Sequence, residues 1–314
     1  MKKIATIFLR ISLPGILFCY ILIVNDIGLV WTQVSGISAP TWIGTFILAA
    51  MLTFLAALRL KIVVRDVSLR TMLYVRFVSS AYGFVLPGTV AADGMRVYML
   101  GKTEGKYSRY SAAVIVDKAL GLITLLVLGV LGLLGTRSIE SFALVIFFSV
   151  AALCLAAIFL VAKSPTSYNK ISGILFGGQQ KTSLAGKCFG FASRVLASLK
   201  EFANNVRVML ANLFFCVVFQ ICWALKGALL SHSVGAGFIF LDMLWIHVVL
   251  TLAFMLPLSF GGIGVREGTL IGLMGLIGLE PEKALAISFG FLAMQLVHVL
   301  AGFGLEIYVN GRRA

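Results

Sequence analysis

The sequence predicts an all-α, polytopic integral membrane protein that forms one domain over residues 1–314. Hydrophobic residues make up 60% of the chain and charged residues only 12%, whereas a typical soluble domain is roughly 45–50% apolar and about 25% charged. The mean hydropathy is +1.04. Together these values exclude an ordinary soluble enzyme, a disordered chain and a disulfide scaffold.

About six apolar runs are predicted to cross the membrane once each. The first run, residues 11–24, follows Lys2, Lys3 and Arg10 and resembles a signal peptide. No convincing small-residue cleavage site follows it, so we expect a retained first helix. Each of the other five has about 20 residues, enough for a hydrocarbon core of about 30 Å. These five runs cover residues 40–60, 112–134, 142–162, 208–231 and 284–308.

Two further apolar regions are interrupted, and they are predicted to form broken helical hairpins. Charged residues interrupt region 69–110, and a proline and three glycines break region 242–279 between Leu256 and Gly264. Proline and repeated glycine do not continue a helix. Non-helical backbone at membrane depth survives only where protein or a water-filled cavity covers it. The hairpins are therefore either re-entrant or made of two full spans.

The distribution of basic residues predicts the orientation. The net charge is +14, and the basic residues fall between apolar runs, as the positive-inside rule requires. The basic loop 163–207 and both termini are predicted to be cytoplasmic, with an amphipathic helix at about 184–200 on the inner membrane surface. Regions 69–110 and 242–279 then enter from opposite sides. A basic inner surface attracts anionic lipid, and nucleic acid is not an expected partner.

The two broken regions share an internal pattern. Leu86-Pro87 is followed after eight residues by Arg96, and Leu256-Pro257 is followed after eight residues by Arg266. Leu-Pro pairs are common, so chance is one explanation. The other is an inverted repeat, a recurring transporter design in which broken helices meet at a substrate site near the bilayer midplane.

Arg96 and Arg266 lie next to these breaks, and we predict that they hold an anion in a polar cavity. An arginine at mid-bilayer costs about 2.5–3.5 kcal/mol on insertion scales, and a guanidinium binds phosphate in a bidentate manner. Gly261, Gly262 and Gly264 would let the backbone N–H groups of a helix start approach that anion.

The alternative is that these arginines pair with carboxylates for structural reasons. Asp93 precedes Arg96 by three residues and could pair with it. Glu267 adjoins Arg266, and adjacent residues point to different faces of a helix. We therefore expect Arg266 and Glu267 not to pair with each other.

Other charged residues interrupt apolar segments. Asp117 and Lys118 begin the next predicted span, where they either belong to the site or anchor the helix at the interface. Arg76 is placed at the cytoplasmic entrance. Lys226 and Glu306 are weaker candidates that could be interfacial.

The sequence contains no motif of a known enzyme chemistry. There is no Walker loop, nucleotide fingerprint, zinc-protease motif or nucleophile elbow. The five cysteines and three histidines show no metal-ligand spacing. We therefore expect no catalytic residue, metal or cofactor.

Three segments resemble signatures of the membrane domain of lysylphosphatidylglycerol synthases and of their stand-alone, flippase-like relatives. Residues 85–100 have Leu-Pro-Gly, an acid and then arginine; residues 114–122 have Asp117-Lys118 where the family commonly has Asp/Glu-Arg. Residues 256–268 are the most specific, with Leu-Pro-x-x-x-Gly-Gly-x-Gly-x-Arg-Glu-Gly. The resemblance covers nearly the whole chain. Departures are Lys118 and the pair Ala91-Ala92, where glycines are frequent.

The resemblance implies a lipid flippase-like domain in the bacterial cytoplasmic membrane, without the soluble aminoacyl-transferase domain of the full synthases. The substrate would be a phosphate-bearing polar lipid: an aminoacyl-phospholipid, a glycolipid or a polyprenyl-phosphate-linked molecule. Arg96 and Arg266 would hold the phosphate, and nearby carboxylates would position them. The predicted substrate-binding residues are Pro87, Asp93, Arg96, Asp117, Lys118, Pro257, Gly261, Gly262, Gly264, Arg266 and Glu267.

Three other functions fit the same residues. The main alternative is a non-catalytic accessory protein of a cell-envelope lipid or polysaccharide synthesis complex, with a synthase or glycosyltransferase as its partner. A membrane-embedded enzyme acting on lipid phosphates and a carrier for ions or small solutes also stay open. Membrane lipids, either anionic phospholipid or lipid-linked sugar, are the expected partners of the transporter.

Overall fold

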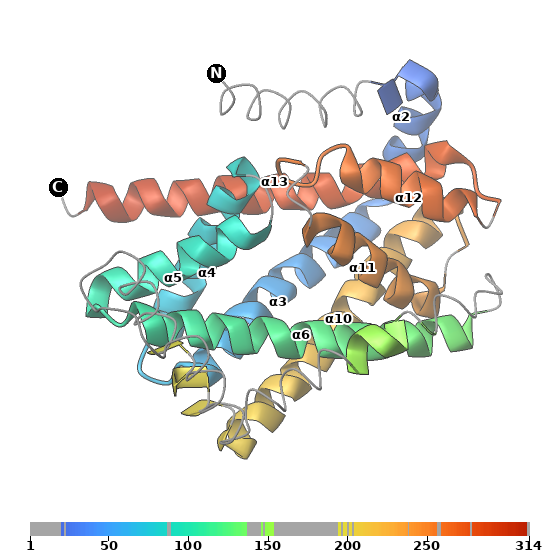
Figure 1. Ribbon diagram of the computed structural model, residues 1–314. Coiled ribbons are helices and arrows are strands. Elements are labelled where there is room, and N and C mark those ends of the chain that lie inside the picture. Colours follow the sequence, from blue (N-terminus) through green and yellow to red (C-terminus); the bar gives the residue numbers. More distant parts are fainter. Residues whose placement is uncertain are drawn as a thin grey trace, which may run out of the picture.

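The computed structural model describes residues 20–21, 23–86, 89–136, 146, 148–153, 194–195, 197–199, 201–202, 204–237, 239–255, 259–276 and 278–312. Within these residues the chain is helical and contains no strand, which confirms the predicted all-α class (Figure 1). The helices are α2 (Ile27–Ser35), α3 (Ala39–Val63), α4 (Leu69–Val85), α5 (Thr89–Glu104), α6 (Tyr107–Gly135), α10 (Val206–Ser233), α11 (Phe240–Met255), α12 (Val265–Gly275) and α13 (Pro281–Gly311).

Four of these helices, α3, α6, α10 and α13, are long and apolar enough to cross a membrane. They coincide with four of the six predicted spans. Ser38 caps the start of α3 through its hydroxyl, and prolines stand in the first turns of α3 and α13, where a missing N–H costs nothing. The predicted spans 11–24 and 142–162, and most of the basic loop 163–207, lie outside the described residues.

The connection between the first two predicted spans contains the short helix α2, which was not predicted from the sequence. The side chain of Asp26 accepts a hydrogen bond from the N–H of Leu29 at 3.1 Å and so caps the helix. One face of α2 packs on α13, with Val30 2% exposed. A good cap and a buried apolar face together favour helix over loop.

Both broken regions form the predicted helix–break–helix hairpins. In the first, α4 packs on α5; in the second, α11 packs on α12. The four helices have 17, 16, 16 and 11 residues, and a helix needs about 20 residues to cross the hydrocarbon core. Figure 1 shows that each hairpin returns to the end of the bundle from which it starts, and that the two hairpins start from opposite ends. They are therefore re-entrant. Pro87 and Pro257, in the two breaks, lie outside the described residues.

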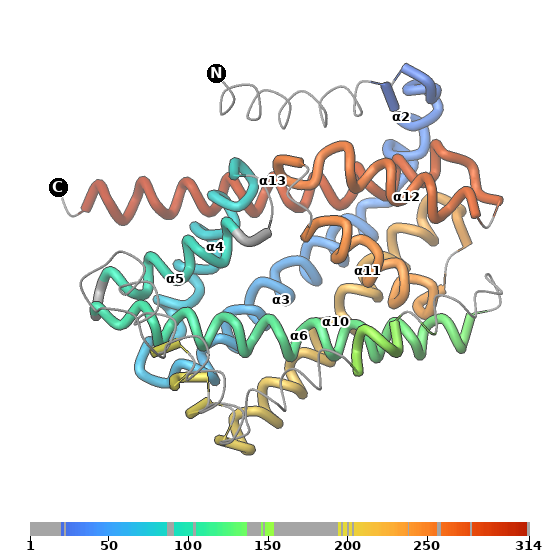
Figure 2. The backbone as a smooth tube through the Cα atoms, in the orientation of Figure 1, coloured from blue at the N-terminus to red at the C-terminus, as the bar shows by residue number. Residues whose placement is uncertain are grey.

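The helices α3–α6 and α10–α13 form two halves with the same order of contacts. Helix α3 packs on α4 as α10 packs on α11, and α5 packs on α6 as α12 packs on α13. Each half also reaches into the other, because α4 packs on α13 and α11 packs on α6. Figure 2 shows α3 and α10 running in opposite directions, and likewise α6 and α13. This is the arrangement that an inverted repeat predicts.

Glycines serve the same purpose at two of the contacts that join the halves, those of α6 with α11 and of α13 with α4. A Cβ on Gly132 of α6 would lie 2.6 Å from the carbonyl oxygen of Leu241, and one on Gly302 of α13 would lie 2.5 Å from that of Phe77. Small residues let helix backbones approach closely, which is the usual source of helix–helix affinity in membranes. The first hairpin is thus held against α13 in the same way as the second against α6.

Candidate functional site

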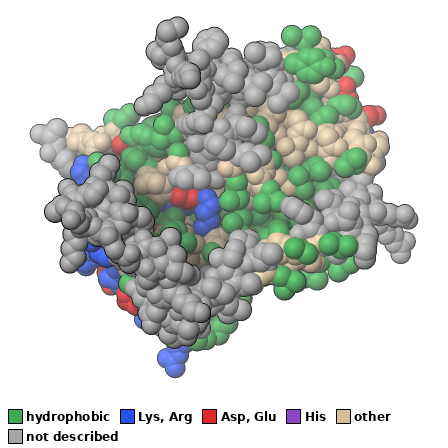
Figure 3. All heavy atoms as spheres, viewed as in Figure 1, with side chains coloured by type: hydrophobic (Ala, Val, Ile, Leu, Met, Phe, Trp, Pro, Cys, Tyr) green, Lys and Arg blue, Asp and Glu red, His purple; other side chains and the backbone are tan. Residues whose placement is uncertain are grey.

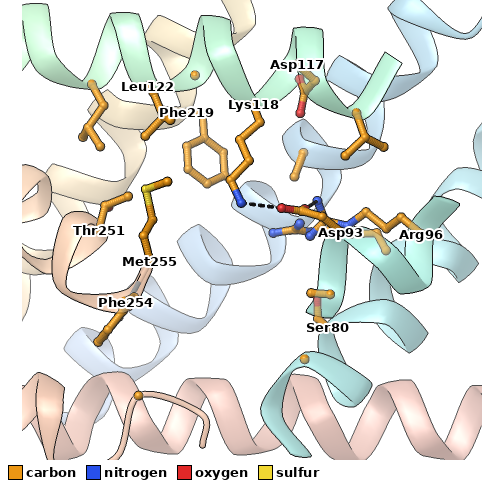
Figure 4. A pocket seen from close by; sticks show the side chains of 18 of the residues that line it. Ser80, Asp93, Arg96, Asp117, Lys118, Leu122, Phe219, Thr251, Phe254 and Met255 are labelled. Atoms are coloured by element: carbon orange, nitrogen blue, oxygen red, sulfur yellow. Dashed lines mark hydrogen bonds and ion pairs between the residues drawn. The ribbon is translucent and has the colours of Figure 1, made fainter. Parts of the chain in front are cut away.

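A cavity of about 430 Å³ lies between the two hairpins. Helices α4 and α5 form one side and α11 the opposite side, and residues of α3, α6, α10 and α13 complete the lining. In Figure 3 acidic and basic side chains are visible in a hollow near the middle of one face of the molecule. Figure 4 shows the cavity from close by.

One carboxylate, that of Asp93, is shared by two cations at the cavity. Its Oδ1 lies 2.8 Å from Nη1 of Arg96, one turn further along α5, and its Oδ2 pairs with Nζ of Lys118, which reaches in from α6 (Figure 4). Arg96 also donates from Nε to the hydroxyl of Ser79 at 3.2 Å. The predicted residues Asp93, Arg96 and Lys118 therefore come together. Asp93 and Arg96 form an ion pair and also line the cavity, so structural pairing and a place in the site do not exclude each other.

The predicted residue Asp117 also lines the cavity, but it belongs to a separate and more enclosed pair. Its Oδ1 lies 3.0 Å from Nε of Arg59, whose side chain is 8% exposed, and its carbonyl oxygen accepts from Nη2 of the same arginine at 2.9 Å. Asn212 of α10 donates both to Oδ1 of Asp117 and to the carbonyl oxygen of Arg59, at 3.1 and 3.0 Å. This group ties α3, α6 and α10 together.

Sequence reasoning missed Arg59 and Asn212. Arg59 lies near the end of an apolar run and close to Lys61 and Arg65, so its position alone is typical of a basic residue at the membrane surface. An aspartate within a predicted span needs a partner, so Asp117 was the signal that could have found Arg59. Asn212 carries no charge, and a single amide in an apolar run gives no such signal.

Arg76 of α4 faces the cavity without a carboxylate of its own. It lines the cavity together with Arg96 and Lys118. Its Nε is buried and has no hydrogen-bond partner, and no ion pair of Arg76 is present among the described residues. Sequence reasoning placed Arg76 at an entrance, and the structure places it on the cavity wall.

The side of the cavity formed by α11 carries no lysine, arginine or carboxylate, and it presents His247, Thr251, Phe254 and Met255. Figure 4 shows Phe254 and Met255 of α11, with Leu122 of α6 and Phe219 of α10, facing across the cavity from Asp93 and Arg96. The cavity therefore joins a charged wall to an apolar wall, which suits an amphipathic ligand.

The second predicted arginine, Arg266, is sealed behind the cavity. Its side chain is 3% exposed and that of Glu267 is 0% exposed, and neither residue is among those that line the cavity. Nη2 of Arg266 lies 2.9 Å from Oε1 of Glu267, so the expectation that these neighbours do not pair is wrong. Glu267 turns back to the start of its helix, where Oε2 accepts the N–H of Gly264 at 2.6 Å. The long arginine side chain can then reach the same carboxylate.

Two polar residues of α13, both missed by sequence reasoning, complete this buried network. Ser288 accepts from Nε of Arg266 at 2.8 Å and donates to Glu267 at 2.6 Å. Gln295 accepts from Nη1 of Arg266 at 2.9 Å, and its Nε2 donates to the carbonyl oxygen of Gly261 at 3.0 Å. The network therefore fixes the segment from Gly261 to Gly264, here called the glycine segment, against α13.

The glycine segment touches the cavity at Gly261 and Gly262. Gly261 has φ +60°, and a Cβ there would lie 2.4 Å from the ring of Phe84 on α4. This position thus needs glycine both for its backbone and for contact between the hairpins. Gly264 has φ +81° and starts α12. Its N–H donates to the carboxylate of Glu267. The start of α12, which the sequence predicts to bind the anion of a ligand, is therefore already bound to a carboxylate of the protein itself.

The two weaker candidates lie apart from these groups. Glu306 accepts a hydrogen bond from the hydroxyl of Tyr82 at 2.9 Å, which links α13 to α4. Nζ of Lys226 lies 5.6 Å from the ring centre of Trp223 and 4.9 Å from that of Phe291. Neither residue lines the cavity.

Comparison with known proteins agrees with this architecture. A UPF0104 membrane protein of Methanothermobacter thermautotrophicus is 25% identical over 288 residues, which cover 83% of this chain and 84% of that protein. A UPF0104 membrane protein of Pyrococcus horikoshii is 24% identical over 219 residues, covering 64% and 65%. No solved structure matches. The family described as "Lysylphosphatidylglycerol synthase TM region" matches residues 7–302, and the chain therefore belongs to that family.

Proposed function

We propose that this protein is a flippase-like transporter that moves a phosphate-bearing polar lipid between the leaflets of the cytoplasmic membrane. The observation that carries the proposal is the cavity itself, in which a cation-rich wall faces an apolar wall between two re-entrant hairpins. A lipid head group would enter the charged part while its tails stay in the bilayer. The proposal assigns no catalytic residue.

The depth of the cavity supports this proposal. Lys118 lies 11 residues into the 29-residue helix α6, which corresponds to about 17 Å along a helix of about 44 Å. Gln295 lies 14 residues into α13, or about 21 Å. An ionisable group at such depth is costly and is functional by default. The charged wall is therefore where a head group would cross the hydrocarbon core.

The residues take different roles in this proposal. Arg96 and Lys118 bind the phosphate, and Asp93 holds both cations in place between binding events. The pair of Arg59 and Asp117 supports the wall behind them. For Arg266 the geometry favours a positioning role, because its guanidinium is already bound by Glu267, Ser288 and Gln295.

The charge distribution supports a cytoplasmic location of the C-terminal end of α13. The ends of α3, α5 and α13 and the starts of α4 and α6 lie at one end of the bundle (Figure 1). These ends carry Lys61, Arg70, Lys102, Arg109 and Arg312, and Figure 3 shows basic side chains gathered there and acidic ones at the opposite end. The positive-inside rule assigns the basic end to the cytoplasm.

Leaflet exchange in proteoliposomes tests the proposed function. We would reconstitute the purified protein and measure exchange of labelled phosphatidylglycerol, lysyl-phosphatidylglycerol, phosphatidic acid and a polyprenyl-phosphate sugar. Arg96→Gln is expected to slow exchange of the transported lipid by about 10- to 100-fold, because it removes a charge-assisted hydrogen bond of roughly 1.5–3 kcal/mol.

The matched control is Arg109→Gln, which removes an arginine that pairs with Asp66 outside the cavity and should leave exchange unchanged. Equal exchange by the wild type and Arg96→Gln would refute the assigned site. A folded wild-type protein that exchanges none of the lipids would refute transport by the protein alone and favour the accessory role.

A further inference from the structure

We infer that the cavity selects a lipid whose phosphate is a monoester and therefore carries two negative charges, and that Arg76 is the residue that selects it. This inference rests on the proposed function, since it names the substrate class of the same site.

The charged groups of the cavity do not balance. Of the carboxylates whose side chains the structure describes, only those of Asp93 and Asp117 line the cavity. Asp117 is taken up by Arg59. Asp93 is then left to balance three cations, Arg76, Arg96 and Lys118. Three positive charges and one negative charge leave an excess of two.

Arg76 contributes one of these excess positive charges, and it differs from the other two cations in its contacts. Arg96 and Lys118 each contact Asp93, whereas the buried Nε of Arg76 has no hydrogen-bond partner within the part of the chain that the structure describes. Arg76 and Arg96 also line a second, smaller hollow beside the main cavity, so the two arginines face the same region. A buried donor and an unpaired charge are both expensive. An anionic ligand that reaches Arg76 would remove both costs.

The size of the excess distinguishes between classes of head group. A phosphodiester carries one negative charge and would leave one cation unbalanced. A phosphomonoester, with a second pKa of about 6, carries close to two charges at pH 8 and would balance the wall. A head group with an added lysyl cation would increase the imbalance. The charge count thus favours the monoester.

The apolar wall favours a lipid over a soluble phosphate. Phe254 and Met255 of α11 lie across the cavity from Asp93 and Arg96 (Figure 4). A soluble phosphomonoester such as glycerol 3-phosphate would leave this wall without an apolar partner. A lipid would keep its polar head at the cations and its glycerol and acyl groups against the apolar wall.

Equilibrium binding of two nearly identical lipids tests the inference. Phosphatidic acid and phosphatidylmethanol differ by one methyl group, which converts the dianionic monoester into a monoanionic diester. We would measure the Kd of both, and of glycerol 3-phosphate, for the detergent-solubilised full chain at pH 8. Phosphatidic acid is expected to bind at least about tenfold more tightly than phosphatidylmethanol, as one additional charge-assisted contact would give.

Substitutions in α4 test whether Arg76 is the residue that gives the preference for the monoester. Arg76→Gln should abolish the preference by lowering the affinity for phosphatidic acid. An unchanged affinity of this variant for phosphatidylmethanol would show that the site is folded. Arg76→Lys keeps the charge and should restore much of the preference. The control is Arg70→Gln, which removes an exposed arginine of the same helix outside the cavity and should change neither affinity.

Three results would overturn the inference. These are equal affinities of the wild type for the two lipids, a preference that survives in Arg76→Gln, and binding of glycerol 3-phosphate as tight as that of phosphatidic acid. Leaflet exchange of the same two lipids is measured separately. Exchange without a preference for the monoester would leave the proposed transport standing and reject only the substrate class, whereas selective binding without exchange would reject transport and retain the site.

Discussion

Glu267→Ala is expected to lower the free energy of unfolding by about 3–5 kcal/mol, the cost of leaving a buried charge without its partner. The carboxylate accepts from Nε and Nη2 of Arg266, from Ser288 and from the N–H of Gly264. Its removal leaves a guanidinium that is 3% exposed facing an empty space. The measurement is reversible unfolding in mixed detergent micelles.

The matched control is Glu280→Ala. Glu280 also pairs with a cation, Lys283 at 3.2 Å, but its side chain is 67% exposed, and exposed pairs contribute only about 0–1 kcal/mol. Glu267→Gln should fall between the two, because it keeps an acceptor for Ser288 and Arg266 but loses the charge. If Glu267→Ala cost no more than Glu280→Ala, the buried network would not stabilise the second hairpin.

Gly261→Ala is expected to be the next most damaging change, at about 2–5 kcal/mol. An L-residue at φ +60° costs about 1–2 kcal/mol, and overpacking against a neighbour costs about 1–3 kcal/mol more. The neighbour is the ring of Phe84, 2.4 Å from the added Cβ. Because this contact joins the two hairpins beside the cavity, the variant should also slow lipid exchange.

Two further variants separate the backbone cost from the clash. Gly235 has φ +63° and nothing within 4 Å of an added Cβ, so Gly235→Ala should show only the backbone cost of about 1–2 kcal/mol. Adding Phe84→Leu to Gly261→Ala should recover part of the loss, because a smaller side chain relieves the clash. Equal effects of Gly261→Ala and Gly235→Ala would mean that the hairpins do not press on each other at this point.

Most of the fold could be predicted because it depends on local properties of the chain. Apolar runs of about 20 residues are sufficient to identify spans, and proline and glycine mark the breaks in both hairpins whatever surrounds them. The matching positions of Arg96 and Arg266 also pointed to the repeat. The helix α2 was missed because its formation depends on packing against α13, more than 240 residues later.

The two halves of the repeat show where local pattern ceases to be informative. The sequence treats Arg96 and Arg266 as equivalents, each eight residues after a Leu-Pro pair. In the structure Arg96 shares Asp93 with Lys118 at an open cavity, whereas Arg266 is enclosed by Glu267, Ser288 and Gln295. Serine and glutamine within an apolar run carry no charge, so nothing in the pattern marks them as ligands of a buried arginine.

Local patterns in the sequence are enough to identify a polytopic helical membrane protein with two interrupted hairpins and ionisable groups near the breaks. Hydropathy, proline and glycine act over a few neighbouring residues, and these features therefore survive in a linear reading. Which charges neutralise one another, by contrast, depends on the packing of the helices. Arg59 and Asp117 are 58 residues apart, and Asn212 and Asp117 are 95 apart. Such contacts depend on how distant helices pack, and among the described residues they leave Nε of Arg76, at the cavity, without a hydrogen-bond partner.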